Sequence, residues 1–342
     1  MKRVLPSVIL AIGLILGATP ARAIENGKNA IGGPVVGLSS GKARDTFFCS
    51  GAMLEPRIVI TAHHCIETAG GDADFLLKNK ITVSLPGTVL NNLLSNVANV
   101  LQIVTKPEMW TIGICADGYC DDLDDVAFLI IDRDFPVPAN LKVATVDDLN
   151  RFRSSRATVI TYGYGLTGPY KPSTTPFSLT ARLEKPNPGG YGEYAFNVSV
   201  EGTQNICAGD SGGPSYVVEE NTLYYLGPTS GTRRPSCIVV PIASGGFYGG
   251  TAIAFRPELL SKAREIANAV KATAELKAKQ EAELKAKQEL EARIAADLKA
   301  KQEAETKAAA TRKTTITCVK GKLSKKITAV KPNCPTGYKL KK

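Results

Sequence analysis

Residues 207–214 read CAGDSGGP, and this segment indicates the fold and the chemistry of the chain more strongly than any other. Ser211 lies in it with glycine on both sides. A serine hydroxyl is a weak nucleophile, so it needs a nearby base and hydrogen-bond donors for the oxyanion that forms on attack. Glycine lets the backbone turn tightly enough for the amides of Gly209 and Ser211 to point toward one spot. The alternative is an ordinary glycine-rich turn that ends in proline.

Two other segments supply the groups that such a serine needs. Residues 61–65 read TAHHC and follow an apolar β-type run, so they offer a histidine base at the end of a strand. Residues 124–129 read DDVAFL and offer an aspartate ahead of another such run. The order along the chain is histidine, aspartate, serine.

From Ile24 to about Ala254 the sequence is a succession of short β-type runs separated by glycine, proline, asparagine and serine. Examples are residues 57–61 and 126–131, and the pattern predicts an all-β domain. The first helical periodicity starts at Pro257. The apolar residues that recur there at spacings of three and four are Leu259, Leu260, Ala263, Ile266, Ala267 and Val270.

Together these segments resemble the trypsin/chymotrypsin family of serine peptidases over roughly residues 24–270. The resemblance implies an all-β fold of two six-stranded Greek-key barrels, followed here by a C-terminal helix. It also implies a serine endopeptidase that cleaves protein or peptide substrates through an acyl-enzyme intermediate, with no cofactor and no metal. A catalytically inactive, protease-like binding protein is the alternative, and a structural cell-wall protein is a third reading.

The resemblance assigns roles to particular residues. His64 is the base because it directly precedes a cysteine, Asp125 orients it, and Ser211 is the nucleophile. The amides of Gly209 and Ser211 form the oxyanion hole. His63 departs from the family pattern, because a small residue is more usual there, and it is the alternative base. The neighbouring acids Asp121, Asp122 and Asp124 are expected in a solvated loop, with Ca²⁺ binding as the alternative.

Activation and specificity are implied in the same way. Members of the family mature when a new N-terminus places its amine beside the aspartate that precedes the catalytic serine. Here the pair is Ile24 with Asp210, and the alternative is that Ile24 is only a frayed terminus.

The family's specificity pocket falls on Asn205 at its base, with Thr232 and Gly250 as walls. Without a carboxylate at the base, an uncharged substrate side chain is expected, because an unpaired cation in a dry pocket is costly.

Residues 1–23 have the parts of a signal peptide, namely a basic start, an apolar run and a final ARA. The apolar run is shorter than the roughly 20 residues that cross a bilayer, so an uncleaved anchor is the less favoured alternative. The sequence therefore predicts an exported protein, secreted or associated with the cell surface, in which signal peptidase itself frees Ile24.

The eight cysteines of an exported chain are expected to form disulfides. Sequence alone permits many pairings, but their placement groups them as neighbours. The family resemblance implies that one pair holds the histidine loop and another the serine loop, while a third matches no obvious family bridge. Zinc binding is the weaker alternative, because no CxxC motif occurs. The expected pairs are Cys49 with Cys65, Cys115 with Cys120, Cys207 with Cys237, and Cys318 with Cys334.

The net charge of +10 comes from the C-terminal part of the chain. Residues 271–342 hold 19 Lys+Arg and 8 Asp+Glu, a balance of +11, which leaves −1 for residues 1–270. Nucleic-acid binding by the main domain therefore has no support.

Residues 271–312 predict a charged helical stalk. The octet AELKAKQE at residues 274–281 repeats directly and consists of strong helix formers, with Glu and Lys four apart. A coiled coil is the alternative, disfavoured because the apolar residues do not follow a heptad repeat.

Residues 313–342 predict a small basic unit stapled by two cysteines, similar to short C-terminal motifs of exported bacterial proteins. An anionic cell-surface polymer or a membrane is its candidate partner, and a solubilising tail is the alternative.

Overall fold

The structure is a computed structural model of the 342-residue chain. It describes residues 24, 27–40, 47–68, 80–86, 96–105, 125–166, 173–184, 194–197, 204, 206–232, 247–250 and 252–342. The chain divides into two compact units, Met1–Val270 and Lys271–Lys342.

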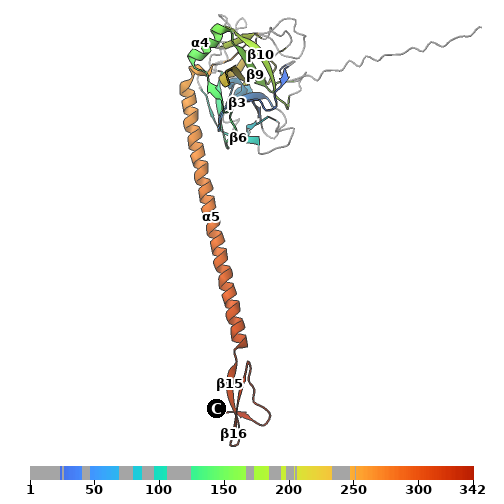
Figure 1. The fold of residues 1–342 in the computed structure, drawn as a ribbon, viewed down its shortest axis with the longest axis vertical. Coiled ribbons are helices and arrows are strands. Elements are labelled where there is room, and N and C mark those ends of the chain that lie inside the picture. Colours follow the sequence, from blue (N-terminus) through green and yellow to red (C-terminus); the bar gives the residue numbers. More distant parts are fainter. Residues whose placement is uncertain are drawn as a thin grey trace, which may run out of the picture. The chain divides into compact units, whose positions relative to one another are not determined.

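The first half of unit Met1–Val270 is a closed antiparallel barrel of six strands, in the order β2-β3-β4-β7-β6-β5. Two of them, β3 and β6, are labelled in Figure 1. β7 is buried along its whole length because it lies between β4 and β6. The first of the two expected barrels is therefore confirmed. Its strands are β2 (Val36–Ser39), β3 (Cys49–Glu55), β4 (Ile58–Thr61), β5 (Thr82–Ser84), β6 (Val97–Val104) and β7 (Ala127–Ile131), and the short helix α1 (His63–Thr68) follows β4.

The second half is an eight-stranded sheet in the order β1-β10-β11-β14-β13-β12-β9, and β9 also pairs with β10. Two strands go beyond the expected six, because β1 pairs with β10 at one edge and β8 lies parallel to β13. That these strands form a second closed barrel stays a prediction. They are β1 (Lys28–Asn29), β8 (Leu141–Val143), β9 (Thr158–Gly163), β10 (Phe177–Glu184), β11 (Tyr194–Asn197), β12 (Pro214–Glu219), β13 (Thr222–Thr232) and β14 (Phe247–Gly250).

One hydrophobic cluster joins the barrel, the sheet and the start of the C-terminal helix. It includes Phe128 and Ile130 of β7, Tyr216 of β12 and Leu260 of the helix. Burial of apolar surface stabilises a fold by roughly 25 cal/mol per Å². A cluster shared by the barrel, the sheet and the helix therefore holds the barrel and the sheet together.

Two helices complete this unit. α4 (Val146–Ser155) begins with a capping box, in which the side chains of Thr145 and Asp148 each accept a hydrogen bond from the other's backbone amide. The helix buries Leu149 and Phe152. After the short 3₁₀ turn Ile253–Phe255, the long helix α5 (Pro257–Thr311) begins, and its buried residues all lie in its first turns. α4 therefore packs its buried side chains into a cluster of sheet residues, and the first turns of α5 pack into the cluster shared with the barrel.

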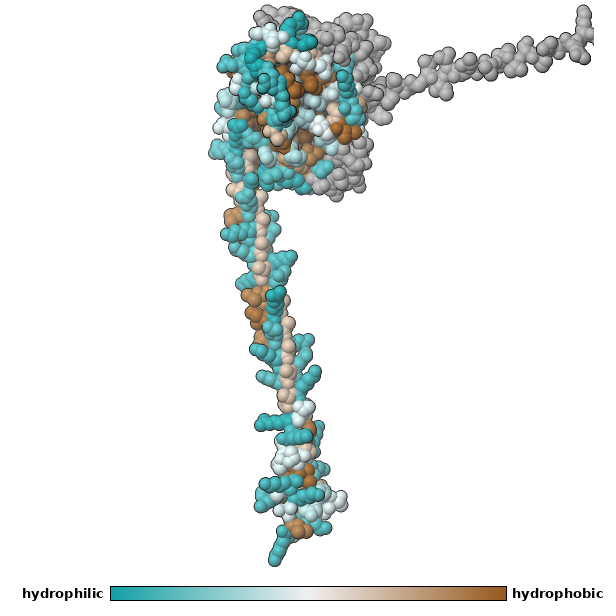
Figure 2. All heavy atoms as spheres, in the orientation of Figure 1, coloured by the Kyte–Doolittle hydropathy of each residue, from teal (hydrophilic) through white to brown (hydrophobic). Residues whose placement is uncertain are grey.

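The unit Lys271–Lys342 contains the rest of α5, whose side chains are exposed and largely hydrophilic (Figure 2). It ends in a three-stranded sheet of β15 (Thr314–Lys320), β16 (Leu323–Ala329) and β17 (Lys339–Leu340), in the order β16-β15-β17. Across the described residues, no helix combines the length and the apolar character that a membrane span requires. The coiled-coil alternative stays untested.

Candidate active site

The expected base and its acid meet at one end of the first barrel. β4 pairs with β7 so that Thr61 lies opposite Ala127. His64 lies just after β4 and Asp125 just before β7, so both extend beyond the same end of this strand pair. His64 Nδ1 lies 2.7 Å from Asp125 Oδ2, and the His64 amide donates to Asp125 Oδ1 at 2.8 Å. The carboxylate therefore holds both the ring and the backbone of the histidine.

A third group completes this contact, because Ser230 Oγ donates to Asp125 Oδ2 at 2.5 Å. The Asp125 side chain is only 4% exposed, whereas that of His64 is 27% exposed. Burial by itself would raise the pKa of Asp125, but the hydrogen bonds from His64 and Ser230 bring it below its ordinary value. Asp125 is thus an ionised acceptor, and the His64 ring keeps an edge toward solvent.

Ser211 is tied to the histidine side of the site by the first barrel. The Ser50 amide donates to Ser211 O at 2.9 Å. Its neighbour Cys49 forms a disulfide with Cys65, the residue that follows His64. A ring nitrogen of His64 and the two sulfurs all lie within 4.8 Å of one another. One strand, β3, therefore holds the serine turn and the histidine helix together.

Ser211 is tied to the aspartate side by β13. The Gly212 amide donates to Thr229 O, and the Thr229 amide donates to Gly213 O, both at 2.8 Å. Thr229 directly precedes Ser230, which binds Asp125. Two short chains of contacts thus connect the serine turn to the histidine through β3 and to the aspartate through β13.

The turn around Ser211 depends on glycine. Gly209 and Gly212 have φ values of +93° and +77°, which L-residues with a side chain rarely adopt. A Cβ on Gly212 would also lie 2.1 Å from Thr61 Oγ1. Within the part of the chain that the structure describes, the amides of Gly209 and Ser211 donate no hydrogen bond. The resemblance assigns these two amides to the oxyanion hole, and this assignment stays a prediction.

Asp210 faces away from solvent into a cradle of backbone amides. Its Oδ1 accepts from Gly165 and its Oδ2 from Cys207, each at 2.7 Å, and the Ile24 backbone N–H also donates to it. A Cβ on Gly163 or Gly165 would lie 2.1 Å or 2.6 Å from the carboxylate oxygens, so only glycine leaves room for it. Burial raises the pKa of Asp210 to about 7, against the lowering effect of these hydrogen bonds. Without a cation beside it, this carboxyl group is about half protonated at neutral pH.

Comparison with known proteins agrees with this geometry. The family model named Trypsin matches residues 24–246, more than half of the chain. The chain is also 30% identical over 216 residues to a protein named Trypsin from Saccharopolyspora erythraea, covering 59% of this chain and 84% of that protein. This chain belongs to the trypsin family. As a member of that family it is a trypsin-like serine protease in type, with proteins or peptides as its class of substrate.

The expected pocket of this trypsin-family chain is only partly described. Thr232 ends β13 and Gly250 ends β14, and these strands pair so that Thr232 lies opposite Tyr248 and Thr229 opposite Gly250. The two expected walls therefore lie on neighbouring strands. Asn205, the expected base, lies outside the described residues, as do the acids Asp121, Asp122 and Asp124.

The disulfides that the structure describes follow the neighbour pairing. Cys49 bonds to Cys65, and Cys318 bonds to Cys334. Cys207 is also in a disulfide, and its partner lies outside the described residues. The remaining expected cysteines, Cys115, Cys120 and Cys237, lie there too. A zinc ion beside His64 would need the thiolates of Cys49 and Cys65, and their bond removes both.

Sequence reasoning missed three contributors to the site. Ser230 is 105 residues from Asp125 along the chain, and no local motif marks its contact. Ser50 donates through Oγ to Gly209 O at 2.8 Å and has no sequence signal either. The pair Gly163 and Gly165 could have been found, because two glycines around a single residue in a β-type run indicate close packing against the backbone.

His63 points to a different partner from His64. Its Nδ1 lies 3.1 Å from Thr105 Oγ1, which itself donates to Val126 O at 3.1 Å. Since the threonine hydroxyl has one proton, it accepts from His63 Nδ1–H, and neutral His63 carries its proton there. Burial lowers the pKa of His63, as does the nearby His64, while Asp125 opposes the shift. His63 is therefore a neutral link between the start of α1 and Thr105, the residue that follows β6.

The variant His63→Ala is expected to lower kcat/KM by less than about tenfold, because His64 keeps both contacts to Asp125. The unfolded chain takes up a proton at His63 below about pH 6.5, whereas the folded chain resists it. His63 thus weakens the fold as the pH falls, and the variant should be less sensitive to acid. Kinetics and thermal unfolding from about pH 5 to about pH 9 test both points. A loss as large as that of His64→Ala would identify His63 as the base.

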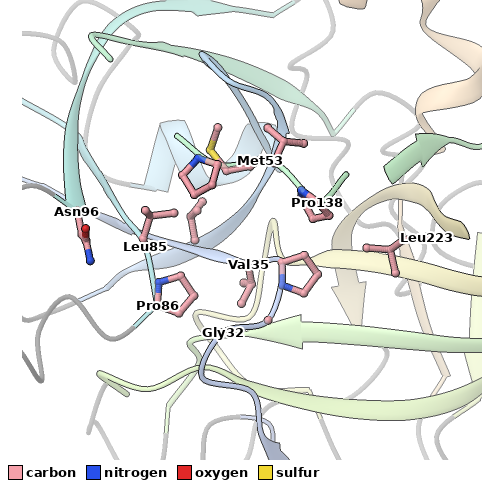
Figure 3. Close-up of a pocket in the computed structure, with 13 residues that line it drawn as sticks. Gly32, Val35, Met53, Leu85, Pro86, Asn96, Pro138 and Leu223 are labelled. Carbon is pink, nitrogen blue, oxygen red and sulfur yellow. The ribbon is translucent and has the colours of Figure 1, made fainter. Parts of the chain in front are cut away.

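A cavity of about 510 Å³ lies apart from these residues (Figure 3). Prolines and aliphatic side chains line most of it, with Asn96 as a polar side chain at one side. None of the expected catalytic residues contributes to its wall. Its lining residues include Gly32, Val35, Met53, Leu85, Pro86, Asn96, Pro138 and Leu223.

Proposed function

We propose that this chain is an exported serine endopeptidase with the triad Ser211, His64 and Asp125. The observation that carries the proposal is the contact between His64 Nδ1 and Asp125, because it leaves Nε2 as the nitrogen that can serve Ser211. The two chains of contacts from the serine turn to His64 and Asp125 support it.

In the first half-reaction, Ser211 Oγ attacks the peptide carbonyl carbon while His64 Nε2 takes the hydroxyl proton. Asp125 stabilises the imidazolium at Nδ1. The carbonyl oxygen becomes an oxyanion that accepts hydrogen bonds from the amides of Gly209 and Ser211. His64 then gives its proton to the leaving amine, the C–N bond breaks, and an acyl-enzyme remains.

In the second half-reaction, water attacks the ester carbon of the acyl-enzyme while His64 takes a proton from it. The same two amides hold the second oxyanion. Its collapse breaks the bond to Ser211 Oγ, and His64 returns the proton to that oxygen. The products are two peptides, and the enzyme is restored without a cofactor.

Activation is proposed to occur when signal peptidase cuts after Ala23. The freed amine of Ile24 would then form an ion pair with Asp210 and hold the oxyanion hole in shape. Three observations support this: Ile24 is 0% exposed, its backbone N–H already donates to Asp210, and the family match begins at this residue. A frayed terminus would be exposed.

The remaining assignments follow from the same proposal. Asn205, Thr232 and Gly250 would form a pocket for an uncharged substrate side chain. Residues 1–23 would be the signal peptide, 24–270 the protease domain with a second barrel, 271–312 a helical stalk and 313–342 a basic terminal motif. The mature protein would be secreted or held at the cell surface.

A fluorophosphonate probe tests the proposal, because it labels a serine only where a base and an oxyanion hole activate it. The chain beginning at Ile24 should be labelled, and Ser211→Ala should not. The variant Ser261→Ala, which changes an exposed serine of α5, should be labelled like the unaltered chain. Absence of label on the unaltered, correctly processed chain would favour the inactive binding protein instead.

A further inference from the structure

The C-terminal sheet concentrates positive charge that the proposed peptidase does not use. Residues 313–342 contain nine lysines and no acidic residue or arginine. In residues 271–312, by contrast, the remaining 10 Lys+Arg of the unit are nearly balanced by its 8 Asp+Glu. The lysines of the sheet unit are Lys313, Lys320, Lys322, Lys325, Lys326, Lys331, Lys339, Lys341 and Lys342.

One face of this sheet combines lysines with exposed leucines. Directly opposed residues of antiparallel strands share a face, and here Leu323 lies opposite Lys320 while both Lys325 and Leu340 lie opposite Cys318. Side chains alternate along β15, so Lys320 and Cys318 also share that face. Leu323 is 64% exposed and Leu340 is 58% exposed. In Figure 2, hydrophobic atoms lie among hydrophilic ones in this part of the chain.

The sheet holds these side chains on a fixed scaffold. Cys318 is 0% exposed and its disulfide to Cys334 ties β15 to the segment before β17. On the other face, Thr315 and Thr328 share a hydrogen bond of 2.7 Å between their hydroxyls. Because Leu323 and Leu340 are exposed, they lie outside the buried centre of residues 313–342, which is Cys318 and its disulfide.

We propose that this face binds the anionic headgroups of a lipid membrane, with Leu323 and Leu340 entering the boundary of the acyl chains. Lysines near an anionic surface each contribute a favourable electrostatic interaction, and apolar side chains between them add burial. A soluble anionic polymer would use the lysines but gain nothing from the leucines. Nucleic acid fits less well, because residues 313–342 lack arginine for base edges and have Tyr338 as their one aromatic residue for stacking.

Co-sedimentation with vesicles tests this proposal on the full chain, with Ser211→Ala to prevent self-cleavage. Vesicles of phosphatidylglycerol mixed with phosphatidylcholine should bind it, and phosphatidylcholine alone should not. The double variant Lys320→Gln, Lys325→Gln should weaken binding by about 25-fold, or about fivefold for each lysine. The double variant Leu323→Ser, Leu340→Ser should weaken it by about tenfold or more.

A matched control removes the same charge from the helix. Lys285→Gln with Lys299→Gln changes exposed lysines of α5 that lie among glutamates, and it should leave vesicle binding within about twofold. With Ser211 restored, all these variants should cleave a peptide at the unaltered rate, so vesicle binding and peptidase activity are separate readouts.

Two results would overturn the proposal. One is equal binding to neutral and anionic vesicles, or no binding to either kind. The other is binding to soluble polyphosphate that matches binding to anionic vesicles and is unaffected by the leucine changes, which would assign the face to a soluble polymer. The inference goes beyond the proposed function and survives if the chain proves not to be a peptidase.

Discussion

Replacing Ser211 with alanine should lower kcat for a peptide substrate by about 10⁴- to 10⁶-fold, with little change in KM. The alanine methyl group cannot attack a carbonyl carbon, whereas the amides of Gly209 and Ser211 can still bind the substrate oxygen. Asp125 keeps its contacts to His64 and Ser230, so the fold should be unaffected. Steady-state kinetics on the purified chain beginning at Ile24 measure the loss, and thermal unfolding checks the fold.

The variant Ser230→Ala should lower activity less than Ser211→Ala does. It removes one hydrogen bond to a buried carboxylate but leaves both contacts from His64, so roughly a tenfold to hundredfold loss is expected. Ser211→Ala with most of its activity intact would contradict the assigned nucleophile. Equal losses in the two variants would show that Ser211 acts only in holding the site together.

One extra residue before Ile24 should lower kcat/KM by roughly 10²- to 10³-fold. The extension replaces the free amine by a peptide N–H, which donates to Asp210 but carries no charge. Asp210 precedes Ser211, so an unpaired carboxylate at this depth disturbs the turn that carries the oxyanion hole. The measurement compares chains that begin at Ile24 with chains that begin one glycine earlier.

Ile24→Val at the true N-terminus is the control, because it keeps the amine and most of the apolar side chain, and it should retain activity. The extended chain offers a second readout. Its Asp210 has a pKa of about 7 when folded and an ordinary value when unfolded, so the folded state binds the proton more tightly. Stability should fall as the pH rises from about 4 to about 7, by about 4 kcal/mol in all. The processed chain should show no such fall, and full activity of the extended chain would refute the proposed activation.

Sequence is most informative where a few adjacent residues meet a local structural demand. The segment around Ser211 needs glycine because Gly209 and Gly212 have positive φ values, and a side chain at Gly212 would collide with Thr61. These glycines can be read directly from the sequence. The short apolar β-type runs between turn residues predicted strands of the first barrel, and β4 and β7, which these runs form, are buried at every position. The extra strands β1 and β8 were missed, because two or three residues carry no measurable period.

The sequence by itself determined which side chains could act: one serine in a glycine turn, one histidine before a cysteine, and one aspartate before an apolar strand. It also determined where the charge lies, because composition does not depend on folding. Only the tertiary structure decided which groups surround them. Ser230 on Asp125 and Thr105 on His63 join residues 105 and 42 positions apart. Such contacts come from strand register and core packing, which no local stretch of sequence encodes.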